Sequence, residues 1–354
     1  MAHLQLILSY FCKSKRRFLK SIYTPSTVEQ FFYCKFQSAA VIFFFYPWSS
    51  PMIHSIQKIL AAALLTSSSL MALNITSATF NNIDQGWNSE QLAKLYFHHS
   101  ETQRQWAWEM LSKVTFTGDE KVLDFGCRDG KISAEMARIA KNGSVCAIDV
   151  SKPMIHLAKM CFPSFAFPNL TFHNSASFDL EDFPGKQDCD YVCAFTVFHL
   201  LPNPLETLKT LKTHLKSSGK LLIIIPTGKN PELYQAACEI FPKYGLELPW
   251  LKKNPTSGSN MRSMEGCTAF LEEAGFQVES MEIVSTDNPF YSREACIAWH
   301  MGTATATWQI PADKSEAFFT DIIDRMVELN PSLIDEEGRF HFVMPRMHVI
   351  ATPH

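Results

Sequence analysis

The chain has 354 residues, of which 46% are hydrophobic and 19% are charged, so it has enough apolar residues for a large core and extensive disorder is not expected. Its formal net charge of -3 provides no basic surface of the kind that nucleic-acid binding requires, so no nucleic-acid partner is expected. Its ten cysteines include no CxxC pair and no Cys/His cluster with zinc-ligand spacing, which indicates a reduced protein without a structural metal.

Residues 1–80 differ from the rest of the chain. Residues 1–51 combine a basic stretch with an aromatic, apolar one. Met52 begins a segment, residues 52–80, that is similar to a signal peptide, because Lys58 is its last charge and residues 59–73 are uncharged and largely apolar. That run is fifteen residues long, shorter than the roughly 20 that a membrane-spanning helix needs.

Three interpretations of this segment remain open. In the first, Met52 is the true start and residues 1–51 are translated upstream sequence. In the second, the segment from Met52 is an export signal or a membrane anchor. In the third, residues 1–80 are a poorly ordered extension. Under the second interpretation, residues 39–73 are the candidates for membrane contact.

From Gln85 onward, apolar residues recur at spacings that predict alternating strands and helices. Helices are predicted over residues 92–114, 130–142, 205–215 and 263–274, with another beginning at the N-cap Ser151. Strands are predicted over residues 121–126, 144–150, 170–173, 190–195, 220–226, 278–284 and 340–350. This alternation predicts an α/β fold over residues 85–354, with a seven-stranded, mostly parallel sheet, helices on both faces and the last two strands pairing like a hairpin.

Two stretches, about 228–262 and 288–339, do not fit this alternation. Long insertions near the carboxyl edge of a parallel sheet usually have a function, because ligands bind there. We expect both insertions to be mostly helical and to form a cap over a substrate pocket.

The sequence VLDFGCRDG at residues 122–130 is the strongest local signal. A strand that ends in an acid, followed by a glycine turn that opens a helix, lets a ligand approach the backbone closely. Asp124 is placed for a cationic amine, and Asp149, 25 residues later, for ribose hydroxyls. The pair fits an adenosyl ligand with a charged amino-acid tail. The glycine turn alone fits an ordinary strand–helix connection equally well, and Arg128 disfavours a dinucleotide, which needs a glycine there.

Four motifs together resemble the class I S-adenosylmethionine-dependent methyltransferases. Residues 123–130 (LDFGCRDG) are similar to motif I, normally LDxGCGxG, and residues 147–151 (AIDVS) contain the ribose-binding acid. Residues 195–200 (FTVFHL) and 215–221 (LKSSGKL) resemble the strand-four motif and the turn before strand five. The resemblance covers roughly residues 90–352 and is nearest to the trans-aconitate and juvenile-hormone-acid methyltransferases. It implies a Rossmann-like fold, S-adenosyl-L-methionine as cofactor and a small-molecule methyl acceptor.

The resemblance also implies a set of cofactor-binding residues. Those expected at the methionine part are Asp124, Gly126, Cys127, Gly130 and Phe195. Those expected at the ribose and the adenine are Asp149, Val150, Met154, Ser175 and Ala176. Tyr96 and Gln103 on the leading helix are expected to close over the cofactor.

Two residues depart from the family pattern. Arg128 replaces the second glycine of motif I, which requires a backbone conformation that arginine can adopt and a side chain that points outward. Ser175 stands where the family often has an acid, so a charged acceptor for the adenine is lost.

His199 is the candidate catalytic residue for acid–base chemistry, and local packing is the alternative interpretation. Methyl transfer to a carboxylate needs no base, because the nucleophile is already ionised and alignment is the main requirement. Trp250, Trp299 and Trp308 lie in or beside the insertions, where they form either a pocket wall or the core of the cap.

The predicted function is methyl transfer to a small molecule, O-directed and with a carboxylate as one candidate acceptor. The alternatives are a macromolecular methyltransferase acting on RNA, protein or a lipid precursor, and a non-catalytic cofactor-binding protein, which Arg128 and Ser175 motivate. Since the cofactor is made in the cytosol, a cytoplasmic location is predicted; anchoring or export through the segment from Met52 is the alternative. The oligomeric state stays open.

Overall fold

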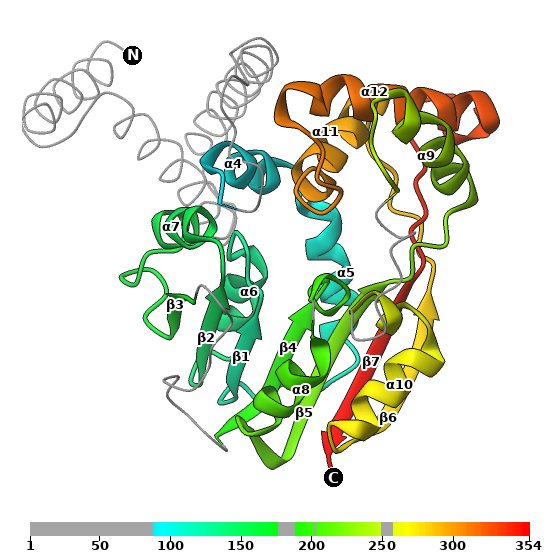
Figure 1. Cartoon of the computed structure of the whole chain (residues 1–354). Coiled ribbons are helices and arrows are strands. Elements are labelled where there is room, and N and C mark those ends of the chain that lie inside the picture. Colours follow the sequence, from blue (N-terminus) through cyan, green and yellow to red (C-terminus); the bar gives the residue numbers. More distant parts are fainter. Residues whose placement is uncertain (1–87, 176–187, 202, 249–257) are drawn as a thin grey trace, which may run out of the picture. The chain divides into compact units, whose positions relative to one another are not determined.

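The computed structural model describes residues 88–175, 188–201, 203–248 and 258–354 (Figure 1). The chain divides into two units, Met1–Thr79 and Phe80–His354, and every described residue belongs to the second. The N-terminal segments 1–51 and 52–80, with the proposed membrane-contact region, lie outside the described residues, as do Ala176 and Trp250. Within the described ranges, no helix is both long enough and apolar enough to cross a membrane.

A single sheet of seven strands forms the centre of the described unit, in the order β3-β2-β1-β4-β5-β7-β6. The strands are β1 (Lys121–Phe125), β2 (Ser144–Asp149), β3 (Leu170–Asn174), β4 (Cys189–Phe195), β5 (Leu215–Pro226), β6 (Phe276–Val284) and β7 (Arg346–Pro353). Only β7 runs antiparallel to its neighbours, and it pairs with both β5 and β6. The predicted α/β class, the mostly parallel seven-stranded sheet and the closing antiparallel pair are therefore confirmed.

Helices cover both faces of the sheet, because successive strand residues point into two separate cores. Val122 belongs to one buried cluster and Leu123 to the other. The first cluster is covered by α5 (Glu101–Leu111), α6 (Lys131–Ile139) and α7 (Lys152–Cys161), and the second by α8 (Pro204–Lys212) and α10 (Met264–Glu273). Residues 221–225 of β5 are fully buried, as expected for a strand covered on both faces.

The leading helix differs from its prediction. Residues 92–114 were expected to form one helix, but the structure has α4 (Glu90–His99) and α5, separated at Ser100. The hydroxyl of Ser100 donates to Oδ2 of Asp129 at 2.7 Å, and Nζ of Lys131 donates to the carbonyl oxygen of Phe97. These tertiary hydrogen bonds hold the residues between α4 and α5 against the start of α6. The local sequence around Ser100 does not predict them, so it does not predict the break in the helix.

Two strand boundaries also differ. β5 begins at Leu215 rather than at residue 220, because Leu215 already pairs with Cys189 beside a β-bulge. β7 begins at Arg346 rather than at residue 340, since Phe340 forms only isolated bridges and Pro345 has no N–H to donate to a ladder.

The described residues of the two insertions form three longer helices, α9 (Pro231–Lys243), α11 (Arg293–Ala304) and α12 (Ser315–Leu329). They also form the 3-10 turns η3 (Gly258–Arg262), η4 (Ala312–Lys314) and η5 (Pro331–Leu333). In Figure 1 the three helices gather beyond the end of the sheet at which β5 finishes. Phe241, Phe318 and Trp308 pack edge-to-face or tilted within this group, with Phe241 and Phe318 ring centres 5.0 Å apart. Trp308 is half-buried and packs against the core of the helical group.

Candidate functional site

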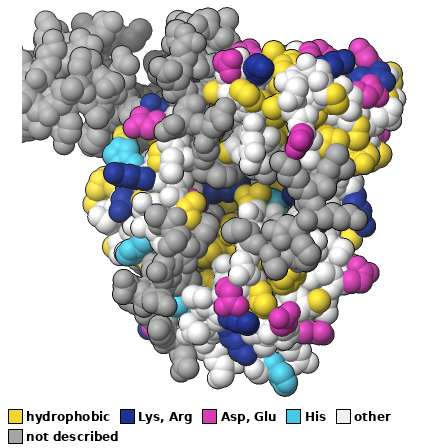
Figure 2. Space-filling view, in the orientation of Figure 1, with side chains coloured by type: hydrophobic (Ala, Val, Ile, Leu, Met, Phe, Trp, Pro, Cys, Tyr) yellow, Lys and Arg dark blue, Asp and Glu magenta, His cyan; other side chains and the backbone are white. Residues whose placement is uncertain are grey.

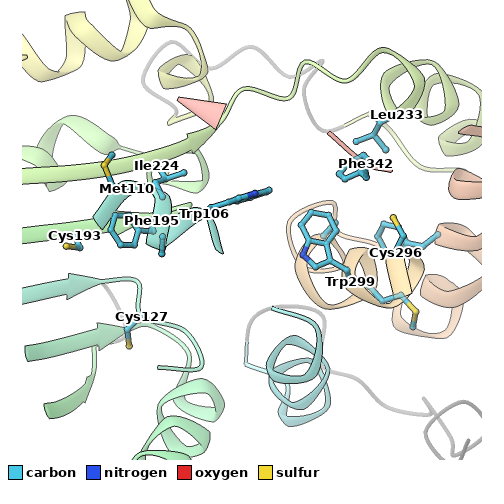
Figure 3. Packing of buried hydrophobic residues seen from close by; sticks show 14 of the residues in the cluster. Trp106, Met110, Cys127, Cys193, Phe195, Ile224, Leu233, Cys296, Trp299 and Phe342 are labelled. Carbon is cyan, nitrogen blue, oxygen red and sulfur yellow. The ribbon is translucent and has the colours of Figure 1, made fainter. Parts of the chain in front are cut away.

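A pocket opens at the carboxyl ends of β1, β4 and β5, which is where parallel sheets bind their ligands. Its lining residues are Tyr96, Gln103, Asp124, Gly126, Cys127, Arg128, Asp129, Ile132, Phe195, Thr196 and Ile224. Figure 3 shows Phe195 on β4, Ile224 on β5 and Cys127 after the end of β1, with Trp106 on the side of Phe195 that faces Trp299 of α11. The structure therefore brings six of the predicted residues into one pocket: Tyr96, Gln103, Asp124, Gly126, Cys127 and Phe195.

Asp124 is the buried acid of this pocket, with 3% of its surface exposed. The hydroxyl of Ser133 donates to its Oδ2 at 2.6 Å, and no donor among the described residues reaches Oδ1. Burial raises the pKa of Asp124 to about 7; the nearby carboxylates Asp149 and Asp129 add to the rise, and Ser133 opposes it. One face of the carboxyl group is thus left for a ligand, and a cationic ligand would favour its ionised form.

The turn after β1 depends on two glycines in the left-handed conformation, Gly126 (φ 81°) and Gly130 (φ 77°). A Cβ on Gly126 would lie 2.3 Å from Cγ2 of Val197, and one on Gly130 would lie 2.7 Å from the ring of Phe172. Gly126 lines the pocket and Gly130 does not. Gly130 begins α6 and lets that helix pack closely on β3, so its observed role is in packing.

Arg128 adopts the left-handed conformation that its position requires, with φ 50°. Its side chain does not point outward as expected. The guanidinium donates from Nη1 to the hydroxyl oxygen of Tyr96 at 3.1 Å and from Nη2 to the carbonyl oxygen of Thr196 at 2.8 Å, and it lies 5.1 Å from the centre of the Tyr96 ring. These acceptors explain the difference, because they hold the cation across the pocket from α4 to the end of β4.

Asp149 ends β2 and is 6% exposed. The backbone N–H of Ser151 donates to its Oδ1 at 2.8 Å, and the backbone N–H of Arg128 donates to its Oδ2 at 2.9 Å. Burial raises the pKa of this carboxyl group, and the two backbone donors and the Arg128 charge oppose the rise. Asp149 does not line the pocket described above, but its bond to Arg128 N places it directly beside the glycine turn.

The residues expected at the adenine follow β2 and β3. Met154 is buried in α7 and packs with Tyr96 and Ala93 of α4. Val150 is half-buried, and the backbone N–H of Ser175 donates to the carbonyl oxygen of Asp149 at 3.1 Å. The side-chain amide of Asn174, which the sequence did not single out, donates to the carbonyl oxygens of Asp149 and Val150, both at 3.0 Å. The carboxyl ends of β2 and β3 are thereby fixed together.

Tyr96 and Gln103 bring the leading helices to the pocket. Burial raises the pKa of the Tyr96 hydroxyl to about 12, so the phenol stays protonated. Oε1 of Gln103 accepts from Nε1 of Trp299 at 3.0 Å. Trp299 is 4% exposed, and its ring centre lies 6.4 Å from that of Trp106. Gln103 therefore joins the pocket to α11.

Four residues that line the pocket were not predicted from the sequence: Asp129, Ile132, Thr196 and Ile224. Ser133, which donates to Asp124, was not predicted either. Asp129 had a usable signal, because it lies inside the glycine turn and is an acid before a helix. Its Oδ2 accepts from Ser100, and it is 3% exposed. Thr196 accepts a hydrogen bond from Arg128 with its backbone carbonyl oxygen, and a pattern of side chains cannot predict such a contact.

His199 lies in η1 (Phe198–Leu200), directly after β4, and does not line the pocket. Its Nδ1 atom is buried and has no hydrogen-bond partner among the described residues. Burial, followed by the charges of Arg262 and Arg128, lowers the pKa of His199 well below its usual value. The imidazole is therefore neutral and a weak base.

No three His, Cys, Asp or Glu side chains in the described part of the chain are arranged to hold a metal ion. Burial raises the pKa of Cys127 well above its usual value, and the surrounding carboxylates add to the rise. This thiol lines the pocket in its neutral form and is not an activated nucleophile.

Residues 96–281, more than half of the chain, match a family model described as a methyltransferase domain. The trans-aconitate 2-methyltransferase of Shigella flexneri serotype 5b (strain 8401) is 24% identical over 270 residues, covering 75% of this chain and 97% of the relative. The malonyl-[acyl-carrier protein] O-methyltransferase of Paenibacillus sp. (strain JDR-2) is 27% identical over 190 residues, covering 51% of this chain and 66% of the relative. A solved structure, the S-adenosylmethionine-dependent methyltransferase from Thiobacillus denitrificans in complex with S-adenosyl-L-homocysteine, aligns with 14% identity and a TM-score of 0.43, covering 72% of this chain and 91% of that one.

The four motifs and the family match agree with each other. The matched region contains the glycine turn, both strand-ending acids and the ends of β4 and β5 that build the pocket. The chain belongs to the methyltransferase-domain family and is an S-adenosylmethionine-dependent methyltransferase.

Proposed function

We propose that the pocket binds S-adenosylmethionine and that the enzyme methylates a carboxylate oxygen of a small acid. In this proposal Asp124 holds the ammonium group of the cofactor and Asp149 holds the ribose hydroxyls. Val150 and Met154 lie beside the adenine, and Ser175 and Ala176 follow them at its amine. Gly126, Cys127, Phe195, Tyr96 and Gln103 surround the methionine part; Gly130 supports the turn from behind.

The pocket residues fit this cofactor. Asp124 offers a buried carboxyl oxygen that no described donor reaches, as an ammonium group requires. Each oxygen of Asp149 accepts one backbone bond, and a carboxylate has further lone pairs for hydroxyl groups. The missing Cβ at Gly126 leaves the backbone open to close approach.

When bound, S-adenosylmethionine supplies a methyl group whose transfer from the sulfonium sulfur to a carboxylate oxygen leaves a thioether and a neutral ester and releases no proton. The residues of this chain then have two tasks, which are to exclude water and to align the acceptor oxygen. Alignment of this kind contributes up to about 7–11 kcal/mol to lowering a reaction barrier.

The state of His199 is the observation that supports a carboxylate acceptor. It is the acid–base candidate at this edge of the sheet, and burial, followed by the charges of Arg262 and Arg128, keeps its pKa low. A hydroxyl acceptor would have to lose a proton to a base, whereas a carboxylate arrives already ionised. The first relative's printed acceptor, trans-aconitate, is also a carboxylic acid, which supports the same class.

We also propose that α9, α11 and α12 form the cap that selects the acceptor. Trp299 of α11 bonds Gln103 of the pocket, and α11 packs against α4, so the cap is joined to the residues around the cofactor. A cytosolic location follows in this proposal from the supply of the cofactor.

The proposal is tested by incubating the full chain with methyl-labelled S-adenosylmethionine and a panel of small acids, with alcohols and amines of matched carbon skeleton as controls. We expect label in the acid samples, released by mild alkali as a methyl ester is. Label that appears only in the alcohols or amines, or only in added RNA or protein, would contradict the proposal.

A further inference from the structure

Arg262 is a charged residue at the carboxyl edge of the sheet that the cofactor assignment does not use. It is the last residue of η3, which packs against η1, the turn that contains His199. Its Nη1 donates to the carbonyl oxygen of Pro226, the last residue of β5, at 2.9 Å. Arg262 is therefore held at the end of β5, and His199 directly follows β4.

The charge of Arg262 has no counter-ion in the described part of the chain. No Asp or Glu among the described residues forms a salt bridge or a hydrogen bond with it. Burial lowers the pKa of its guanidinium to about 10, with no opposing acid. Arg262 is half-buried, and a partly desolvated charge without a partner is costly, so charges of this kind are normally paired or bound to a ligand.

His199 supplies a second unsatisfied polar group at the same edge. Its buried Nδ1 has no hydrogen-bond partner among the described residues. After burial, the charge of Arg262 lowers the pKa of His199 most, and that of Arg128 lowers it less. Two independent features, a cation without an acid and a ring nitrogen without a partner, thus lie close together. Figure 2 shows a hollow near the middle of the visible face, with basic side chains inside it.

We propose that Arg262 and His199 together bind a carboxylate of the methyl acceptor. This inference rests on the proposed function, and it adds the residues that recognise the acceptor. Nη1 of Arg262 already donates to the carbonyl oxygen of Pro226, so its other guanidinium nitrogens would donate charge-assisted hydrogen bonds to the acceptor's carboxylate. The neutral imidazole of His199 would donate one more hydrogen bond from Nδ1.

The consequence is selection by charge. A site built to hydrogen-bond a particular group rejects analogues that lack it, because its own polar groups are then left buried and unpaired. The enzyme should therefore bind ionised acids and reject their esters. Arg262 and His199 act as positioning residues here: they hold the acceptor, and neither takes up a proton.

The test is a calorimetric titration of trans-aconitate into the full chain in the presence of S-adenosylhomocysteine, with the trimethyl ester of trans-aconitate as the neutral probe. We expect the acid to bind the wild type and the ester not to bind. Arg262→Gln should lower the affinity for trans-aconitate by roughly 10- to 100-fold, and Arg262→Lys should lower it by less. Neither substitution should change the affinity for S-adenosylhomocysteine. Arg138→Gln, at an arginine on α6 that lies outside the pocket and outside this edge, is the matched control and should change nothing.

Each outcome separates the two proposals. If the wild type binds trans-aconitate and Arg262→Gln binds it equally well, the anion site is wrong while the acceptor class stands. If the wild type binds neither this acid nor any acid of the panel, yet methylates neutral molecules, both are wrong. If Arg262→Gln does not fold, labelling of wild-type Arg262 with phenylglyoxal replaces it: protection by the acid and not by the ester supports the site, and equal labelling overturns it.

Discussion

The guanidinium of Arg128 donates from Nη2 to the carbonyl oxygen of Thr196 at 2.8 Å, and this bond joins the turn after β1 to the end of β4. The same side chain reaches Tyr96 on α4. Three elements that line the pocket are thereby connected by one residue that stands in place of the second glycine of motif I. A cofactor whose methionine part enters between β1 and β4 has to share this space with the arginine.

Arg128→Gly should make cofactor association faster by about 10-fold, because a charge-assisted hydrogen bond worth roughly 1.5–3 kcal/mol no longer has to open first. The substitution also suits the backbone, since φ at this position is 50°. Stopped-flow tryptophan fluorescence with S-adenosylmethionine measures the rate. An unchanged or slower rate in the glycine variant would mean that the arginine does not obstruct entry.

Cofactor affinity should rise as the pH is raised through about 7. Asp124 has a pKa of about 7 when no ligand is bound, mainly because of burial, and an ammonium group at this carboxylate would lower it. Below pH 7 binding must therefore release a proton, and above it the carboxylate is already ionised. Calorimetry in buffers of different ionisation enthalpy should show proton release at about pH 6 and little at about pH 8. The pH step should be absent in Asp124→Asn; if it persists there, another group is responsible.

With a carboxylate acceptor and saturating cofactor, kcat/KM for the acceptor, which reports the enzyme before the acceptor binds, should show no step from His199 near the usual histidine pKa. Burial, followed by the charges of Arg262 and Arg128, lowers the pKa of this imidazole well below its usual value, so it is neutral at neutral pH before the acceptor binds. His199→Gln should retain kcat within about 10-fold, whereas loss of a general base costs about 10²–10⁴-fold. A loss in the larger range, with a pH step in the wild type, would assign proton transfer to His199.

An ion pair between β7 and α5 should be important for stability, because its arginine is fully buried and its glutamate is half-buried. Arg346 of β7 is fully buried, donates from Nη2 to Glu109 of α5 and lies 4.9 Å from the centre of the Trp106 ring. Its Nε and Nη1 have no partner among the described residues, so Glu109 is the compensating charge. Glu109→Gln should lower the free energy of unfolding in urea by about 3 kcal/mol. The exposed control Glu336→Gln should change it by less than about 0.5 kcal/mol, and equal effects would contradict the pairing.

The sheet was predictable because its signals are local. The runs at 121–126 and 144–150 are continuous and apolar, each ends in an acid, and the structure places both acids at one edge. The break at Ser100 was not predictable, since it depends on a hydrogen bond to Asp129, 29 residues away. The local spacing of apolar residues cannot show that Ser100 will bond to a residue so far away in the sequence.

The pocket residues that belong to a sequence motif were predictable, and those outside the motifs were not. Gly130 belongs to the motif, yet its glycine is needed for packing on Phe172, which only the three-dimensional arrangement reveals. Arg262 lies in an insertion before an ordinary N-cap serine, and nothing in the sequence distinguishes it from a surface arginine. Its partial burial, and the absence of a counter-ion among the described residues, depend on the folded chain.

The most direct test of the cofactor assignment is the affinity of the full chain for S-adenosylhomocysteine, measured by calorimetry for the wild type and for Asp149→Ala. The carboxylate of Asp149 is held by the N–H groups of Arg128 and Ser151 at the end of β2, so it should present its remaining lone pairs to the ribose hydroxyls. Removing it should weaken binding by roughly 1–3 kcal/mol, while circular dichroism shows a folded protein. Unchanged affinity in a folded Asp149→Ala variant would contradict the placement of the ribose at Asp149, and with it the proposed orientation of the cofactor in the pocket.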